Sequence, residues 1–545
     1  SAPTEVVLKK PQQFRLIGRR VPRVDIAAKS DGSAIFTQDI YLPRMLTAVL
    51  ARSPRFGGKV ASFDASAARR VAGVVDVVQV PRGVAVVADT FWAAQKGRAA
   101  LRVHWDDSEA EMRGSAELWR DFRALMAEPG KTARREGDVT RALSGATKIV
   151  EAEFEFPYLA HAPMETEDCV AQIKDGGCEL WAGSQLQSGD QAVAAAILGI
   201  APSKVRINTL YGGGSFGRRA TPNADVVSEA VSVAKAMGTD RPIKVMWTRE
   251  DDIRGGFYRP MFLHRLRGGL DRDGNIVAWH HKLVGQSVFA GTPLESAIRD
   301  GIDPSVIEGA VGLPYHIANL RLDFRLATAG VPVLWWRAVG HTHNAFSTEV
   351  FFDQLAAAAG KDPYQLRRSL LGKHPRHLAV LDLAARKIGW GSAVPQGKGR
   401  GIAVHESFGS FVAQAVEISL DSYGMPVVER VVCAVDCGVA VNPDVIAAQM
   451  EGGLGYGLSA MMFSEITLDR GVVMQSNFHD YPALRIHEMP AVEVHIVPSQ
   501  EAPTGVGEPG LPPIAPAVAN AYFQLTGTAI YRQPLTRHLG QGATR

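Results

Sequence analysis

The sequence AVEVHIVPSQEAPTGVGEPGLPPIAPAVANA, residues 491–521, combines a strand, a tight loop and a helix around one carboxylate. Residues 491–497 alternate apolar and polar side chains, which predicts a strand, and residues 512–521 predict a helix with prolines in its first turn. Between them, Glu508 lies in the glycine- and proline-rich segment 505–510. Glycines let a ligand approach the backbone, and prolines restrict its freedom. The segment predicts a positioned general base, with a helix-capping glutamate in a surface loop as the alternative.

The composition describes a large, nearly neutral chain. Of its 545 residues 46% are hydrophobic, and Lys+Arg 59 against Asp+Glu 56 gives a formal net charge of +3. At about 150 residues per domain, this length predicts several units. The charge is too balanced to indicate a nucleic-acid partner, and no apolar run approaches the roughly 18 residues of a membrane span. We expect a multi-domain globular protein that binds no nucleic acid.

Cysteine and histidine spacing predicts no metal site. The four cysteines stand at positions 169, 178, 433 and 437, so no Cys-x-x-Cys pair occurs, and neither an iron–sulfur cluster nor a structural zinc is expected within the chain. The pairs His280–His281 and His341–His343 lack the i, i+4 spacing and the glutamate of a hydrolytic zinc site. We therefore assign no metal-ligating side chain.

Periodicity along the chain predicts an α+β fold. Residues 14–105 alternate short β-rich runs with turns. The polar segment 106–140 is interpreted as a surface excursion or linker. Beyond residue 148 we expect mixed strands and helices, with long helical stretches at 345–371 and 444–461.

A glycine cluster, GGGSFGRR at 212–219, follows a predicted strand. Gly212, Gly214 and Gly217 satisfy G-x-G-x-x-G, but Pro222 delays the next helix and Glu250, at the end of the next strand, is too distant for a dinucleotide fingerprint. A P-loop would need a following Gly-Lys-Ser/Thr, which is missing. The cluster is either a backbone cradle for an anionic or polar cofactor or a tight structural turn.

Five motifs share one order with a known family: WAGSQ at 181–185, GGSFG at 213–217, WRAVG at 336–340, AQMEGG at 448–453 and GEP at 507–509. With these motifs the chain resembles the molybdenum-binding subunit of the xanthine oxidase and aldehyde oxidoreductase family. The segments most similar to its isoquinoline 1-oxidoreductase β-subunit branch are WTREDD at 247–252, GHTHNAF at 340–346 and QSNFHDY at 475–481.

The resemblance implies a small hammerhead-type α+β domain followed by a large two-part molybdopterin-binding α+β region. Residues 1–147 would form the hammerhead-type domain plus a linker, residues 148–395 the first part of the molybdopterin-binding region, and residues 396–545 the second part with the catalytic glutamate. It also implies a molybdopterin cofactor, in its cytosine dinucleotide form, whose dithiolene holds the molybdenum.

The resemblance also implies roles for single residues. Glu508 would be the general base that takes a proton from water or hydroxide at the molybdenum. Gln185 would bond to an oxo ligand or the pterin, and Arg337 would line the substrate side and stabilise negative charge. The alternatives are strand-end hydrogen bonding for Gln185 and a structural ion pair for Arg337. The residues implied to cradle the cofactor are Gly213, Gly214, Ser215, Phe216, Gly217, Gln449 and Gly452.

Two features depart from the family pattern. Ser215 stands where relatives usually have a further glycine, and the chain contains neither the Gly-Gln-Gly loop that packs on the pterin nor the Ser/Thr-rich loop that holds the nucleotide end. We therefore expect another chain or a preceding segment to supply these loops. The resemblance further implies a [2Fe–2S] small subunit, with a cytochrome c as another candidate partner. The compartment stays open between bacterial cytoplasm and periplasm, because an export signal would lie outside this chain.

The resulting hypothesis is a molybdenum hydroxylase subunit that oxidises an aldehyde or an N-heteroaromatic substrate with water-derived oxygen and passes electrons to an iron–sulfur partner. Two alternatives remain: a nicotinamide-dependent dehydrogenase that uses the Gly212–Gly217 loop, and a non-catalytic scaffold subunit. The hypothesis predicts molybdenum and turnover, the first alternative predicts an absorbance change with NAD, and the second predicts neither.

Overall fold

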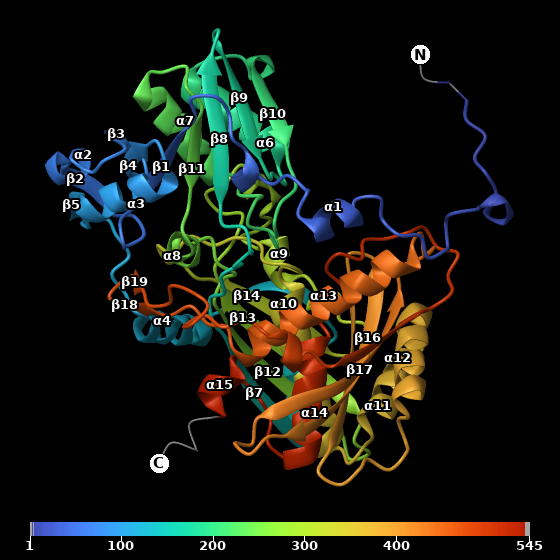
Figure 1. Cartoon of the computed structure of the whole chain (residues 1–545). Helices are drawn as coiled ribbons and strands as arrows, with labels where there is room; N and C mark the ends of the chain where they lie inside the picture. Colours follow the sequence, from blue (N-terminus) through green and yellow to red (C-terminus); the bar gives the residue numbers. More distant parts are fainter. Residues whose placement is uncertain (1–2, 4, 540–545) are drawn as a thin grey trace.

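The computed structural model describes residues 3 and 5–539 and has the predicted α+β fold (Figure 1). Sheets of seven, five and four strands form its framework. In Figure 1 the seven-stranded sheet lies in the upper part of the molecule, and the five- and four-stranded sheets lie with their helices in the lower part. Within the described residues, no helix has the length and apolar character needed to cross a membrane.

The seven-stranded sheet joins strands from both sides of residue 147. Its order is β10-β9-β8-β11-β1-β4-β3. β1 (Leu46–Ala51) pairs in parallel with β11 (Ile243–Met246) and antiparallel with β4 (Gly83–Ala88). The remaining strands are β3 (Val74–Val80), β8 (Asp168–Lys174), β9 (Gly177–Ala182) and β10 (Val205–Thr209). The sheet thus runs across the proposed boundary at residue 147, and the division into domains stays a prediction.

Helix α7 (Asp225–Met237) packs on this sheet and carries a buried carboxylate, Glu229. Arg52 Nε donates to Glu229 Oε1 at 2.9 Å, Arg82 Nε lies 3.1 Å from the same oxygen, and Trp247 Nε1 donates to Glu229 Oε2 at 2.8 Å. Arg52 and Arg82 belong to the N-terminal part of the chain. Glu229 therefore ties that part to the later strands of the sheet.

The five-stranded sheet, in the order β6-β14-β13-β12-β7, corrects one prediction. Segment 106–140, interpreted as a linker, contains α4 (Ser115–Ala127) and β6 (Lys131–Glu136), and β6 is an edge strand of this sheet. α4 forms because Leu118, Phe122 and Met126 recur every four residues and are buried in one core cluster. The other strands are β7 (Lys148–Phe156), β12 (Phe262–Leu270), β13 (Ile276–Gly285) and β14 (Leu320–Leu326).

The four-stranded sheet leads directly to Glu508. Its strands, in spatial order, are β15 (Gly399–Ser407), β16 (Ser410–Leu420), β17 (Pro426–Asp436) and β20 (Ala491–Ile496). The predicted strand, loop and helix are confirmed as β20, the loop with Glu508, and α14 (Ile514–Thr526). Gly401 in β15 allows α14 to pack closely on this strand. A Cβ at this position would lie only 2.2 Å from the Ala517 carbonyl oxygen.

The helical stretch predicted at 345–371 consists of α10 (His341–Ala358) and α11 (Pro363–Leu370), and the glycine-rich helix is α13 (Pro443–Met462). The other elements are α1 (Ile26–Asp31), β2 (Lys59–Asp64), α2 (Ser66–Arg69), α3 (Phe91–Ala100), β5 (Arg102–Asp106), α5 (Val139–Ser144), α6 (Gln187–Leu198), α8 (Arg249–Arg254), α9 (Pro304–Ile307), α12 (Pro375–Ile388), β18 (Leu468–Asp469), β19 (Val472–Val473) and α15 (Leu535–His538).

Candidate active site

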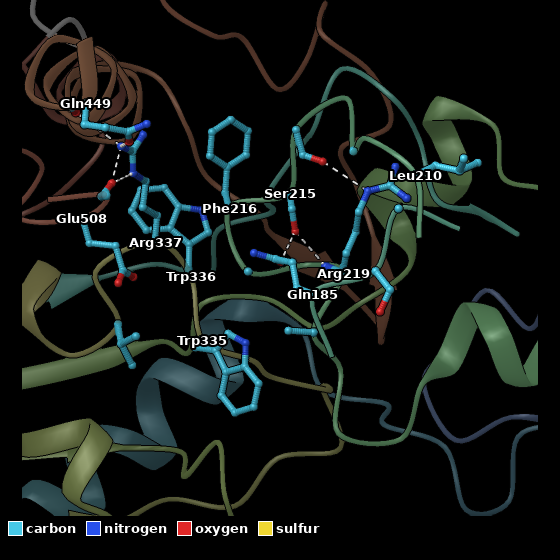
Figure 2. Close-up of a pocket in the computed structure, with 18 residues that line it drawn as sticks. Gln185, Leu210, Ser215, Phe216, Arg219, Trp335, Trp336, Arg337, Gln449 and Glu508 are labelled. Atoms are coloured by element: carbon cyan, nitrogen blue, oxygen red, sulfur yellow. Dashed lines mark hydrogen bonds between the residues drawn. The ribbon is translucent and has the colours of Figure 1, made fainter. Parts of the chain in front are cut away.

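The loop with Glu508 and the glycine loop line the same cavity, which has a volume of about 660 Å³. In Figure 2, Gln185, Ser215 and Arg219 lie on one side, Gln449, Arg337 and Glu508 on the other, and Phe216 and Trp336 between them. The predicted site residues in the cavity wall are Gln185, Gly214, Ser215, Phe216, Gly217, Arg337, Gln449 and Glu508. Gly213 and Gly452 do not line the cavity, although Gly213 lies between two lining glycines and a Cβ at Gly452 would be 4.0 Å from Arg337 Nη1.

Glu508 is partly buried and is held by one of its two carboxylate oxygens. Ala338 N donates to Glu508 Oε1 at 2.8 Å, whereas Oε2 accepts no hydrogen bond from the described residues. Behind the loop, Gln414 Nε2 donates to the carbonyl oxygen of Gly510 at 2.8 Å. A carboxylate fixed at one oxygen and free at the other can take up a proton. The helix-capping alternative is wrong, because the carboxylate accepts from Ala338 and not from the start of α14.

The turn before α10 has a strained backbone that points two amides at carboxylates. Ala338 and Val339 have φ values of +73° and +46°, in the left-handed region that residues with a Cβ rarely adopt. Such a residue costs on the order of 1–3 kcal/mol and is typical of functional sites. Ala338 N donates to Glu508, and Gly340 N donates to Glu308 Oε1 at 2.9 Å. The turn therefore holds two acids, and Glu308 was not predicted from the sequence.

Arg337 connects this turn to the Glu508 loop and to α13. Its Nε donates to the carbonyl oxygen of Gly507 at 2.7 Å, and its Nη2 donates to Gln449 Oε1 at 3.1 Å. Burial lowers the pKa of Arg337, while the nearby Tyr456 and Glu508 act in the opposite direction. No carboxylate among the described residues lies within ion-pair distance, so the structural ion pair considered for Arg337 does not form. Its contacts instead set the position of the loop that carries Glu508.

The glycine loop is shaped by packing at two of its glycines. Gly213 N donates to Glu165 Oε2 at 2.7 Å, and a Cβ at Gly213 would lie 2.5 Å from the Cβ of Glu165. Gly217 has a φ of +109°, and a Cβ there would lie 2.5 Å from the Trp335 carbonyl oxygen. These two glycines are required by the chain itself, whatever the cavity binds.

Ser215 links the glycine loop to Gln185. Its hydroxyl donates to Gln185 Oε1 and accepts from Arg219 N at 2.9 Å (Figure 2). The carbonyl oxygen of the Gln185 side chain is thereby occupied, while its amide nitrogen donates to none of the described residues. Gln185 lies beyond the end of β9, so the strand-end role considered for it is replaced by a contact with the loop.

An aromatic stack that the sequence did not reveal connects three parts of the site. The rings of Phe216 and Tyr456 are 4.1 Å apart, and those of Tyr456 and Trp336 are 4.5 Å apart, both nearly parallel. Phe216 adopts a φ of +58°, and its carbonyl oxygen accepts from Arg337 N at 3.0 Å. Tyr456 follows Gln449 by seven residues on α13, which places both on one helix face and is the signal that could have identified it.

The geometry around the glycine loop does not suit a dinucleotide fingerprint. α7 begins at Asp225, after a turn and Pro222, so Gly217 does not open a helix. Asp225 is buried and paired with Arg218, with Arg218 Nη2 2.7 Å from Asp225 Oδ2. The helix N-terminus that would bind a pyrophosphate is therefore occupied by the chain's own ion pair. This argues against the nicotinamide alternative.

Comparisons with known proteins identify the family of the chain. Models of the molybdopterin cofactor-binding domain match residues 125–371 and 345–490. The isoquinoline 1-oxidoreductase subunit beta of Brevundimonas diminuta is 32% identical over 552 residues, which cover 98% of this chain and 70% of that protein. The chain belongs to the molybdenum-binding subunits of the xanthine oxidase family. This is a family of molybdenum-dependent oxidoreductases that act on aldehydes and N-heterocycles, so the scaffold and nicotinamide alternatives are not supported.

Two further relatives extend the comparison. The membrane-bound aldehyde dehydrogenase [pyrroloquinoline-quinone] of Gluconacetobacter polyoxogenes is 30% identical, and the match covers 97% of this chain and 73% of that protein. The crystal structure of quinoline 2-oxidoreductase from Pseudomonas putida 86 has a TM-score of 0.82 at 14% identity and covers 97% of this chain and 98% of that chain. This structural similarity shows that the chain has the same fold as quinoline 2-oxidoreductase.

The cavity has room for a large polar cofactor. Its volume of about 660 Å³ lies within the range of small-molecule sites. A Cβ at Gly507 would meet nothing closer than Gln449 Oε1, at 4.0 Å, so the wall is open there. Within the described residues, no group of three or more His, Cys, Asp or Glu side chains could hold a metal ion. A metal in this cavity would take its ligands from a cofactor such as molybdopterin.

Proposed function

We propose that the cavity beside Glu508 is the active site of a molybdenum hydroxylase that oxidises an aldehyde or an N-heteroaromatic compound. The observation that supports this most strongly is the carboxylate of Glu508, which a strained turn holds by one oxygen across the cavity from a glycine-rich wall. The names of relatives, an isoquinoline oxidoreductase and an aldehyde dehydrogenase, favour these two substrate classes.

Each residue of the site would have a distinct task. When bound, the molybdenum cofactor would supply a two-electron acceptor next to the substrate carbon. The amides of Gln185 and Gln449 and the main chain at Phe216 and Gly217 would orient the pterin. Glu508 Oε2 would take a proton from the water whose oxygen attacks that carbon. Arg337 would keep the Glu508 loop in place through Gly507 and Gln449.

The proposal includes the cytosine dinucleotide form of the cofactor and two kinds of partner. The four cysteines, Cys169, Cys178, Cys433 and Cys437, are all buried and free, which favours an iron–sulfur cluster on a [2Fe–2S] subunit that receives the electrons. A further chain or segment would supply the Gly-Gln-Gly and Ser/Thr loops. Expression of residues 1–545 alone and together with candidate partners tests this, because only the complex should retain molybdenum and turn over repeatedly.

The decisive experiment uses the purified complex and the variant Glu508→Gln. Glutamine keeps the acceptor for Ala338 N, so folding and molybdenum content should be unchanged, whereas loss of a general base lowers turnover by about 100- to 10000-fold. Glu501→Gln, exposed in the same loop, is the control and should turn over like the parent. Measurements are molybdenum, pterin, bound nucleotide and incorporation of labelled oxygen from water.

Two results would contradict the proposal. Normal turnover in a fully loaded Glu508→Gln complex would remove Glu508 from the mechanism. If the active complex contained pyrroloquinoline quinone and no molybdenum, the proposed molybdenum cofactor would be wrong. Pyrroloquinoline quinone appears in the name of one relative.

A further inference from the structure

A second cavity, of about 340 Å³, is lined by Glu308 and by His341, the residue that directly follows the turn that holds Glu508. Its wall includes Glu308, Phe408 and three histidines, His341, His377 and His405. Glu308 faces this cavity with a side chain that is 27% exposed. The turn thus binds one carboxyl group from the wall of each cavity, Glu508 from the first and Glu308 from the second.

Titratable side chains continue from Glu308 into this second cavity. His341 Nε2 is 3.9 Å from Glu308 Oε2, and His341 Nδ1 is 2.9 Å from His405 Nε2. Gly309 has a φ of +86°, and a Cβ there would lie 3.0 Å from both His341 Nδ1 and His405 Nε2. The glycine therefore allows the two imidazoles to approach each other beside the carboxyl group of Glu308.

The site described above must release protons. Oxidation of a substrate R–H by water, R–H + H₂O → R–OH + 2 H⁺ + 2 e⁻, breaks a C–H bond and forms a C–O bond. The cofactor and an electron-accepting partner would take up the electrons, but the protons would have to reach solvent through the protein. In the proposed function Glu508 takes the first proton, and it must lose this proton again before the next turnover.

We propose that Glu308 relays protons released at Glu508 into the second cavity and from there to solvent. The inference rests on the proposed function. It follows from the shared turn, from the cavity behind Glu308 and from the histidines that continue away from it. Glu308 acts through Glu508 and has no contact with the substrate.

The protonation of Glu308 supports this assignment. Burial raises the pKa of Glu308 to about 8, and the negative charges of Glu508 and Asp303 contribute in the same direction. A group that titrates near the working pH can both accept and release a proton. Burial lowers the pKa of His341 to about 4, so this imidazole is neutral beside Glu308. The other titratable groups around Glu308 and its cavity are Glu349, His377, His405 and Glu406.

The first test measures turnover of the loaded complex with Glu308→Gln, in which the side chain keeps the acceptor for Gly340 N. We expect kcat to fall by about 10- to 100-fold, less than the loss typical of a general base, since water can partly replace a relay. Glu406→Gln, in the wall of the same cavity, is the control and should be unaffected. In Glu308→Ala, added imidazole or formate should restore turnover, because a small acid can carry the proton through the space left by the side chain.

The second test needs no cofactor. In the infrared spectrum of residues 1–545, a carboxylic acid band should disappear as the pH rises through about 8, and it should be missing in Glu308→Gln. Wild-type turnover of Glu308→Gln, or impaired turnover that imidazole and formate do not restore in Glu308→Ala, would overturn the relay. If Glu508→Gln is inactive in the same series, the proposed function stands without it.

Discussion

Gly217 and Gly507 both line the cavity, but the structure gives them opposite roles. A Cβ at Gly217 would lie 2.5 Å from the Trp335 carbonyl oxygen, in a residue whose φ is +109°. A Cβ at Gly507 would lie 4.0 Å from its nearest neighbour, Gln449 Oε1, and points into open space. The first glycine is needed for the fold, and the second is available to a ligand.

This difference predicts the behaviour of two alanine variants. Gly217→Ala should lower the free energy of unfolding by at least about 1–2 kcal/mol, the cost of a left-handed conformation in a residue with a Cβ. Gly507→Ala should leave stability unchanged but reduce the molybdenum and pterin content of the complex. Denaturant unfolding of the chain and metal analysis of the complex measure the two effects. If the Gly507→Ala protein were unstable, Gly507 would be needed for the fold. If it bound a full complement of cofactor, Gly507 would not face the cofactor.

His161 contributes a pH dependence that can be isolated. It is buried, its Nε2 lies 2.9 Å from the Trp335 carbonyl oxygen, and Nδ1 has no partner among the described residues. Burial lowers the pKa of His161 to about 3, whereas in the unfolded chain it stays near 6.5. The unfolded state therefore binds this proton first, and stability is lost as the pH falls from about 6.5 toward 3.

In His161→Gln this part of the acid sensitivity should be absent. Between pH 6.5 and 5 the histidine removes about 2 kcal/mol of stability, at roughly 1.4 kcal/mol per pH unit. The difference in unfolding free energy between parent and variant should shrink or change sign toward pH 5, as measured by urea unfolding across this range. A difference independent of pH would mean that the pKa of His161 is the same in the folded and unfolded states.

At the residue level, the motifs singled out residues that the structure brings to one cavity, while their roles stay predictions. Glu508, Gln185, Arg337 and Gln449 meet at one cavity, as their order along the chain predicted. Glu308 and the left-handed pair at 338 and 339 were missed, because no pattern in Ile-Glu-Gly or Arg-Ala-Val-Gly indicates a positive φ in alanine and valine. Such strain is imposed by the surroundings and not by local preference.

At the level of elements, α7 depends on charges that cross between segments distant in sequence. Glu229→Gln should lower the free energy of unfolding by about 3–5 kcal/mol, because it leaves Arg52 and Arg82 near a buried site without their shared carboxylate. The control is Glu151→Gln, which breaks an exposed pair with Arg267 and should change stability by less than about 1 kcal/mol. Equal effects in denaturant unfolding would show that the buried network contributes no more than a surface pair.

The elements were predicted best where periodicity is local. The strand before Glu508, the helix after it and the two helices divided at Pro363 are confirmed. The prediction of a linker at 106–140 was wrong. The segment is rich in charged residues, but the four-residue spacing of Leu118, Phe122 and Met126 indicates a helix with one apolar face. The pairing of β1 with β11 could not be predicted, since nothing in either strand specifies a partner so far along the chain.

For the whole molecule, the shared sheet predicts how fragments behave. Residues 148–545 without residues 1–147 would leave the edge of β11 that faces β1 unpaired and apolar, so this fragment should aggregate. Co-expression of both fragments should restore soluble protein, measured by gel filtration. A monomeric, cooperatively unfolding 148–545 fragment would instead support a true domain boundary at residue 147.

The same strand arrangement has a consequence for synthesis on the ribosome. β1 and β4 are made early, but the parallel neighbour of β1, Ile243–Met246, is translated roughly 200 residues later. At about 5–20 residues per second, β1 waits on the order of 10 to 40 seconds with this edge open. During that interval Leu46, Ala48 and Leu50, which are buried in the finished core, have no covering layer. The nascent chain should therefore need a holding chaperone, and synonymous codons that slow translation between β4 and β11 should lower the yield of folded protein.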